Sequence, residues 1–386
     1  MKHEEKAYLY WLHQVPGIGD AGMERLIEAC GSARAVYDAS EKRLCRVLSK
    51  AQTDALQRLK KEWKVSEAYR DMLEKGIRLL GIQDEEYPKR LKKISRPPYL
   101  LYVIGGLPKE NALAVAMIGA RECSGYGVAM AQAFATHLAK AGVHIISGMA
   151  RGIDGVSQEA ALAAGGSTFG VLGCGADICY PASNRNLYDA MKQRGGIISP
   201  YPPGTKPQKN LFPYRNQIVA GLADALLVIE ARQKSGTWIT VDRALEQGKD
   251  VYAVPGRLTD RLSDGCNLLI RQGAGIALSP EDMLAELNVL QNRRKNKTEI
   301  VKDAQSVRCG TFPGTEAEQE SGLIQYLDFH PKSVDEILEF VQKEDEEMTV
   351  SQLMFELIQL CMQGKAVQVG GNYFMKVAEK CKSYCN

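Results

Sequence analysis

Glycine, hydroxyl and cationic residues follow four apolar runs in the middle of the chain. They stand at residues 119–127 (GARECSGYG), 148–154 (GMARGID), 173–175 (GCG) and 234–237 (KSGT). The loops that follow the strands of an open parallel sheet meet at one edge, where ligands bind. Small residues leave backbone N–H groups accessible there, so the pattern predicts a site for a row of phosphates. Close packing of helices on strands is the alternative use of these glycines.

Residues 202–217 (PPGTKPQKNLFPYRNQ) combine cations with an aromatic residue. Phe212 is placed to stack on a base while Lys209 and Arg215 hold the flanking phosphates, a combination used to bind single strands. The alternative is that Phe212 and Pro213 only attach a helix to the core. Residues 185–234 hold eight Lys/Arg against three Asp/Glu, which is consistent with a phosphate-binding groove or with a solvated face.

Several cofactor motifs are missing from the sequence. The first loop is not GxGxxG, no GxxxxGK[ST] occurs, and the ten cysteines form no CxxC pair. Dinucleotide, Walker-type ATP and zinc sites are therefore disfavoured, and we expect neither a cofactor nor a metal.

Residues 77–290 alternate short apolar runs with helical patterns. We expect strands at 77–82, 99–105, 114–119, 143–148, 168–173, 196–200, 225–231, 250–256 and 275–279, and helices at 125–141, 152–164, 184–194, 214–223, 237–247 and 267–272. Apolar strands that each precede a helix indicate a parallel sheet covered on both faces. The predicted fold class is α/β, with an extended Rossmann-like, doubly wound, mostly parallel sheet.

Two further domains are expected around this sheet. Residues 1–76 read as helices, with a turn at 15–22 (VPGIGDAG) of the SAM or helix-hairpin-helix kind, which either touches DNA or simply joins two helices. Residues 291–314 read as a basic linker. Residues 315–386 read as an acidic winged-helix-like domain whose final hairpin turns at Gly370 and Gly371. Residues 311–386 carry 6 Lys/Arg against 13 Asp/Glu, so we expect a protein-contact module there and not a duplex-binding transcription factor.

The composition is that of a soluble globular protein. The 386 residues are 45% hydrophobic and 25% charged, with a net charge of +3. No signal peptide and no membrane span are recognisable, so a cytoplasmic protein is expected.

The central blocks resemble the DNA-processing protein A (DprA, also Smf) family in order and spacing. The blocks are VAMIGARECSGYG, SGMARGID, VLGCGADICYPASNRNL, YPPGT, LFPYRNQIVAGL, IEARQKSGTWIT, VYAVPG and GCNLLIRQGA. The resemblance implies a non-catalytic protein that binds single-stranded DNA, protects incoming DNA in natural transformation and loads the RecA recombinase. It also implies a homodimer joined through the Rossmann-like domain, for which the apolar stretch 268–270 is a candidate.

Carried over onto this sequence, the family's DNA-binding pocket falls on three segments. The residues are Gly119, Arg121, Ser124, Gly125, Lys209, Phe212, Arg215, Asn216, Lys234, Ser235 and Gly236. The chain departs from the usual family pattern at Ala120, at Ser157 and Gln158, at Pro200 and at Gln217. Gln217 replaces a second arginine, so we expect the loss of a phosphate contact or of an ion pair.

A nucleotide phosphoribohydrolase of the lysine-decarboxylase-like class is the competing interpretation. That class resembles this fold but needs a glutamate where this chain has Thr240, and a hydroxyl cannot replace that carboxylate. We expect Glu230, Asp154 and Asp177, the other carboxylates at strand ends, to cap helices or to fix loops. The sequence therefore favours a binding protein over an enzyme.

Overall fold

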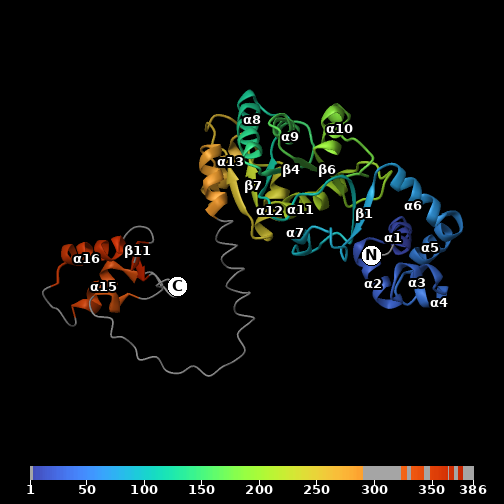
Figure 1. Ribbon diagram of the computed structural model, residues 1–386, viewed down its shortest axis with the longest axis horizontal. Helices are drawn as coiled ribbons and strands as arrows, with labels where there is room; N and C mark the ends of the chain where they lie inside the picture. Colours follow the sequence, from blue (N-terminus) through green and yellow to red (C-terminus); the bar gives the residue numbers. More distant parts are fainter. Residues whose placement is uncertain are drawn as a thin grey trace, which may run out of the picture. The chain divides into compact units, whose positions relative to one another are not determined.

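The computed structural model describes residues 3–289 and, in the tail, 323–327, 332–342, 348–363, 365–368 and 373–376. The chain divides into two compact units, Met1–Asp303 and Ala304–Asn386, coloured from blue to orange and in red in Figure 1. Each unit has its own core and is described separately.

A nine-stranded sheet organises the first unit. Its strands are β1 (Arg78–Gly81), β2 (Leu100–Gly105), β3 (Ala114–Ile118), β4 (His144–Ser147), β5 (Thr168–Val171), β6 (Gly195–Ser199), β7 (Ala225–Val228), β8 (Asp250–Ala253) and β9 (Gly275–Ile276). Their order is β1-β2-β6-β5-β4-β3-β7-β8-β9. Strands β3 to β9 are parallel, and β1 and β2 add an antiparallel edge. The predicted large, mostly parallel sheet is confirmed.

Helices cover both faces of this sheet, as expected for a doubly wound fold. They are α7 (Lys89–Lys92), α8 (Gly125–Lys140), α9 (Ile153–Ala163), α10 (Arg185–Gln193), α11 (Phe212–Leu222), α12 (Thr237–Glu246) and α13 (Asp264–Arg271). Along β3, Ala114, Ala116 and Ile118 pack in the core that holds α11, α12 and α13, whereas Val115 and Met117 pack in the core that holds α8 and α9. Side chains alternate between the faces of a strand, so a continuous apolar run serves both layers.

Among the described residues, no helix combines the length and the apolar character that crossing a lipid bilayer requires.

Two helix starts differ from the sequence prediction by more than one residue. Helix α11 begins at Phe212, two residues before the predicted start, with Pro213 in its first turn. Proline is well tolerated there because the first helical N–H groups have no intrahelical partner. Helix α13 begins at Asp264, three residues before the predicted start.

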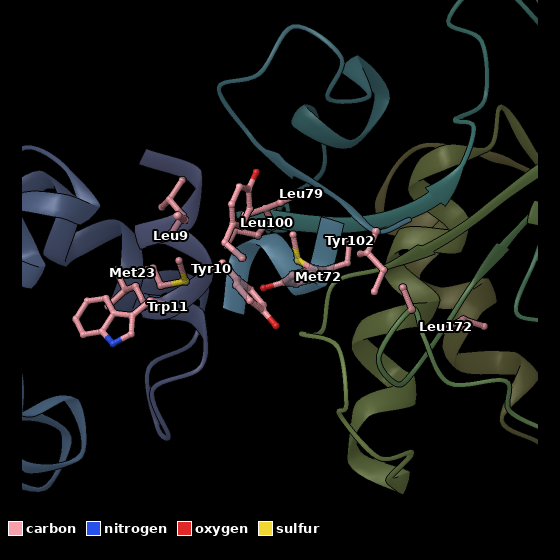
Figure 2. Packing of buried hydrophobic residues seen from close by; sticks show 14 of the residues in the cluster. Leu9, Tyr10, Trp11, Met23, Met72, Leu79, Leu100, Tyr102 and Leu172 are labelled. Atoms are coloured by element: carbon pink, nitrogen blue, oxygen red, sulfur yellow. The ribbon is translucent and has the colours of Figure 1, made fainter. Parts of the chain in front are cut away.

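The helical stretch 3–74 packs directly on the edge of the sheet. Its helices are α1 (His3–His13), α2 (Asp20–Cys30), α3 (Ala33–Asp38), α4 (Glu41–Leu44), α5 (Lys50–Glu62) and α6 (Val65–Glu74). Leu9, Tyr10 and Trp11 of α1 share one buried cluster with Leu100 and Tyr102 of β2, as Figure 2 shows. These helices and the sheet therefore stabilise one another.

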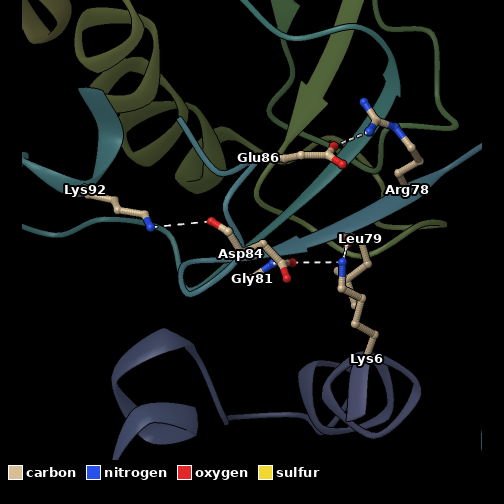
Figure 3. Close-up of polar contacts among 7 residues, drawn as sticks. All are labelled: Lys6, Arg78, Leu79, Gly81, Asp84, Glu86 and Lys92. Atoms are coloured by element: carbon tan, nitrogen blue, oxygen red, sulfur yellow. Dashed lines mark hydrogen bonds and ion pairs between the residues drawn. The ribbon is translucent and has the colours of Figure 1, made fainter. Parts of the chain in front are cut away.

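Polar contacts reinforce this junction. The Lys6 ammonium lies 2.9 Å from the Asp84 carboxylate and donates to the Leu79 carbonyl at 3.1 Å, as drawn in Figure 3. The Asp84 carboxylate also accepts from the Gly81 N–H. Both side chains of this ion pair are largely buried, at 19% and 7% exposed, so solvent screens it less than a surface pair.

In the residues that the structure describes, the second unit has two helices beside a small sheet. Its elements are η3 (Leu323–Tyr326), β10 (Lys332–Ser333), α15 (Val334–Val341), α16 (Val350–Met362), β11 (Ala366–Gln368) and β12 (Tyr373–Lys376). Strands β11 and β12 pair antiparallel, as predicted for the final hairpin. The predicted turn at Gly370 and Gly371 and the predicted linker 291–314 lie outside the described residues.

The imidazoles of His13 and His144 make the stability of the first unit pH-dependent. Burial lowers the pKa of His13, with a smaller opposing effect from Asp20. Burial, with Arg90 and Lys109, lowers the pKa of His144. Below about pH 6.5 both imidazoles bind protons in the unfolded chain, whereas their lowered pKa disfavours protonation in the folded unit. Stability should therefore fall between pH 7 and 5.5, by at most ~1.4 kcal/mol per pH unit for each imidazole.

Urea unfolding followed by tryptophan emission measures this loss, because Trp11, Trp63 and Trp238 all belong to the first unit. A His13→Gln variant keeps a side chain able to bond the Tyr102 hydroxyl, the partner of His13 at 2.9 Å, and should lose less stability over that range. An identical pH dependence in the variant would contradict the assignment to His13.

Candidate nucleic-acid interface

A groove opens where the strand order reverses. From β3 the chain proceeds to β4, β5 and β6 on one side, and β7, β8 and β9 lie on the other, so the loops after β3 and β7 diverge and leave a crevice. The groove holds about 540 Å³. Its lining comes from the loops after β3, β4 and β7, from Tyr180 in the loop after β5, and from the start of α11.

The structure brings together eight of the eleven predicted site residues in the lining of this groove. They are Gly119, Arg121, Lys209, Phe212, Arg215, Asn216, Ser235 and Gly236. Ser124, Gly125 and Lys234 belong to the same loops but lie outside the described lining. The loops after β3 and β7 thus converge as the strand-end argument predicted, and the segment before α11, which its cations and aromatic residue had singled out, lines the same groove.

Two exposed cations stand on the groove. Arg121 follows β3, and its guanidinium carbon lies 5.8 Å from the centre of the Phe212 ring. Lys209 belongs to η2 (Lys209–Leu211), the single turn that leads into α11. Both side chains are solvent-exposed and can move to meet an anion.

Phe212 is held along one edge and faces the groove. A β-carbon on Gly173 would lie 2.7 Å from the ring, closer than real contacts allow, so only glycine fits beneath it. The ring also lines the groove and is only half-buried. The Phe212 side chain therefore attaches α11 to the loop after β5 and also leaves ring surface open to the groove, and its stacking on a base stays a prediction.

Arg215 is the buried member of the cation set. It is 5% exposed, and its Nη1 donates to the Gly148 carbonyl and to the Val171 carbonyl at 2.6 Å. Its Nε donates to the Asn216 side chain at 3.1 Å. The sequence predicted a phosphate contact from Arg215, but most of its N–H donors make hydrogen bonds within the protein. Arg215 thus ties α11 to the ends of β4 and β5.

The charges around Arg215 oppose one another. Burial lowers the pKa of its guanidinium, the Asp154 carboxylate raises it in part, and the nearby Arg121 cation lowers it further. Burial raises the pKa of Asp154 in turn, and Arg215 offsets part of that rise. The guanidinium carbons of Arg121 and Arg215 thus lie 5.8 Å and 5.4 Å from the centre of the Phe212 ring, and the groove lining also holds one buried carboxylate, Asp154.

The backbone and side chain of Ser124 make hydrogen bonds within the protein. Its Oγ accepts from the Gly127 N–H at the start of α8 and donates to the Glu230 carboxylate, which also accepts from the Ser124 N–H at 2.9 Å. Gly119 has a packing role as well, because a β-carbon there would lie 2.7 Å from Ile153. Close packing, the alternative use of these glycines, thus accounts for Gly119.

The strand-end carboxylates fix loops, as the sequence predicted. Glu230 holds the loop at Ser124, Asp154 accepts from the Gly148 N–H, and Asp177 accepts from the Gly204 N–H. Among the described residues that line the groove, Asp154 is the only carboxylate. Thr240 also lines the groove and is buried, so a hydroxyl stands where the phosphoribohydrolase interpretation needs a glutamate.

Gln217 lies away from the groove. Its amide donates to the Arg96 carbonyl at 2.7 Å, and it is 5% exposed. This face of α11 packs inside the protein, so the structure gives no support to the lost phosphate contact that was expected at Gln217, and the alternative, a lost ion pair, stays a prediction.

The turn at 15–22 joins the helices to the sheet. The Asp20 carboxylate accepts from the Tyr99 N–H and from the Tyr214 hydroxyl of α11. The Gly17 carbonyl accepts from the Gln52 side chain. Of the two roles left open for this turn, joining structural elements is the one that these contacts support.

Sequence reasoning missed Tyr180. It lines the groove, is 45% exposed, and its ring centre lies 6.0 Å from that of Phe212. An aromatic residue in the loop after β5, beside Pro181, was the available signal. The local pattern there does not reveal that the ring faces α11.

The fold and the groove define an open, mostly parallel α/β protein with a cationic, aromatic cleft at its switch point. The chain belongs to the DNA recombination-mediator protein A family, which matches residues 78–288. The DNA processing protein DprA of Streptococcus pneumoniae is 42% identical over 206 residues, which cover 53% of this chain and 73% of that protein. DprA of Bacillus subtilis is 39% identical, over 58% of this chain and 75% of its own.

Solved structures agree with this assignment. The DprA structure from Streptococcus pneumoniae is 32% identical, with a TM-score of 0.64, and covers 72% of this chain and 97% of its own. DprA from Helicobacter pylori, whose structure describes a single-stranded DNA binding mode, is 30% identical, with a TM-score of 0.50, over 57% of this chain and 98% of its own.

Replacing Arg215 should destabilise the first unit. Arg215→Met leaves the Gly148 and Val171 carbonyls without these donors and Asp154 without its nearby cation, so we expect a loss of ~2–5 kcal/mol of unfolding free energy. Arg121→Met is the matched control, because Arg121 is exposed and its loss should change stability by at most ~0.5 kcal/mol. Urea unfolding followed by tryptophan emission measures both. Equal, small losses would show that Arg215 has no structural role.

Proposed function

We propose that this chain binds single-stranded DNA across the groove at the switch point. The observation that carries the proposal is the arrangement at Phe212, a partly exposed ring whose centre lies 5.8 Å from the Arg121 guanidinium carbon and 5.4 Å from that of Arg215, with Lys209 on the same groove. An aromatic face binds any base by stacking, and adjacent cations hold the backbone phosphates. The groove offers both kinds of contact.

Electrostatics supports a polyanion as the ligand. Burial lowers the pKa of Arg215 and the nearby Arg121 cation lowers it further, and a phosphate beside these two like charges would relieve their repulsion. Ser235 and Gly236 stand at the start of α12, where the helix dipole and free N–H groups favour an anion. The groove can therefore hold phosphates in two ways, by the dipole and free N–H groups at the start of α12 and by the exposed side chains of Arg121 and Lys209.

The binding is proposed to be stoichiometric, without turnover. The Asp154 carboxylate is occupied by the Gly148 N–H, and Thr240 cannot act as a carboxylate. A phosphoribohydrolase is the alternative. Incubation with a nucleoside monophosphate separates the two, because free base released in proportion to protein concentration would establish the enzyme and no release supports binding alone.

The wider role extends this proposal. We propose a cytoplasmic homodimer that protects incoming DNA during natural transformation and transfers the strand to the RecA recombinase. Tandem grooves would raise affinity through effective concentration.

Within 268–270, Leu269 is buried in the core and is no longer an interface candidate. Ile276 and Leu278, 50% and 73% exposed at the β9 edge, are better placed. A Leu278→Lys variant that sediments as the wild type does would exclude this edge.

The tail is proposed to contact a protein. The part of α16 that faces solvent carries Phe355, Ile358 and Met362, which are 64%, 47% and 85% exposed. The helix Val350–Met362 contains no Lys or Arg, so it lacks the cations that duplex DNA requires. Exposed apolar side chains at helical spacing are typical of a protein-binding surface.

Two substitutions separate the ionic from the stacking contribution. Lys209→Ala should weaken binding to oligothymidine and reduce the slope of log affinity against log salt by about 0.7, the value for one phosphate contact on a single strand. Phe212→Ala should weaken binding by ~1–3 kcal/mol with the slope unchanged. Fluorescence anisotropy at several salt concentrations measures both.

Lys140 provides the control. It lies on α8 outside the groove lining and is exposed, so Lys140→Ala should change neither affinity nor slope. If Lys209→Ala and Phe212→Ala bind as the wild type does, the DNA path does not follow this groove.

A further inference from the structure

Tyr180 and Phe212 form a pair of neighbouring aromatic rings on the groove. Their centres are 6.0 Å apart and their planes differ by 31°. Tyr180 also lines the smaller cavity beneath, together with Gly173, Arg151 and Arg215. The two rings come from different elements, the loop after β5 and the first turn of α11, so their proximity is a property of the folded chain.

The loop that carries Tyr180 is held firmly by hydrogen bonds. The Asn184 side chain, just after this loop, donates to the Met149 and Ala150 carbonyls, and the Tyr188 hydroxyl donates to the Ala176 carbonyl at 2.6 Å. The Tyr180 ring is therefore presented to solvent by a fixed backbone. Such preorganisation reduces the entropy that a ligand must overcome.

A purely structural role for Tyr180 fits the contacts poorly. Tyr126 has almost the same exposure, 44% against 45%, but its hydroxyl donates to the Pro255 carbonyl at 2.8 Å. Within the described residues the Tyr180 hydroxyl has no such partner. An aromatic ring that is half exposed in a groove, with a free hydroxyl, gains most of its contact energy when a ligand covers it.

We propose that Tyr180 is a second stacking residue and that Phe212 and Tyr180 receive two neighbouring bases of the strand. The inference rests on the proposed single-stranded DNA binding and adds a base-contacting residue to it. A base inserted between the rings would need them about 6.8 Å apart, twice the ~3.4 Å stacking distance. At 6.0 Å and with a 31° tilt they serve as adjacent platforms.

The experiment compares oligothymidine affinities of full-length variants. Tyr180→Ala should weaken binding at least fivefold, in the range of one stacked base, with an unchanged salt slope. Tyr180→Phe should bind within twofold of the wild type, because the ring is retained. Tyr126→Ala is the matched control, a tyrosine of equal exposure that is outside the groove lining, and should also bind within twofold.

A second ligand tests whether the loss reflects stacking. On an abasic oligonucleotide of the same length, which keeps the phosphates and has no bases, Tyr180→Ala should bind like the wild type. An equal loss on the abasic strand would assign Tyr180 a structural role and overturn the proposal.

The outcomes also separate this inference from the proposed function. If Phe212→Ala weakens oligothymidine binding and Tyr180→Ala does not, the second platform is refuted and the DNA groove stands. If the wild type fails to bind oligothymidine, both fall.

Discussion

The groove depends on one buried cation. Arg215 extends from the first turns of α11 and donates to carbonyls at the ends of β4 and β5, while its guanidinium lies 5.4 Å from the Phe212 ring centre. A buried guanidinium is tolerated only where its donors are satisfied and a countercharge is near, and Asp154 supplies that charge. The interaction fixes where Phe212 stands relative to the strand ends, and so it fixes the shape of the site.

The charged groups around Arg215 are of two kinds, exposed cations and carboxylates that accept hydrogen bonds from loops. Arg121 and Lys209 are exposed and hold the charges available to a phosphate, whereas the carboxylates at strand ends hold loops and are occupied. Asp154, the carboxylate in the described groove lining, accepts a hydrogen bond from the Gly148 N–H. A site that combines mobile cations, fixed dipoles and stacking rings is suited to hold a strand along its backbone.

Much of the fold could be predicted from the sequence, because apolar runs ended by glycine mark the strands of a parallel sheet and the carboxyl ends of such strands must share an edge. The loops at Arg121, Lys209 and Ser235 followed from that geometry. Which side chains are buried could not be predicted from the sequence. Arg215 and Lys209 look alike there, yet only Arg215 is buried. Tyr180 was missed for the same reason: which face of a loop or helix turns inward depends on tertiary packing.

Single-stranded DNA is proposed to lie in the groove at the β3–β7 switch point. Photocrosslinking of an oligothymidine that carries 5-iodouracil, followed by peptide mapping of the full-length protein, tests it most directly. Crosslinks at Phe212 and Tyr180, within peptides from 172–185 and 209–216, are expected if the strand lies in this groove. Crosslinks confined to the helices of 3–74 or to the tail after residue 315 would contradict it.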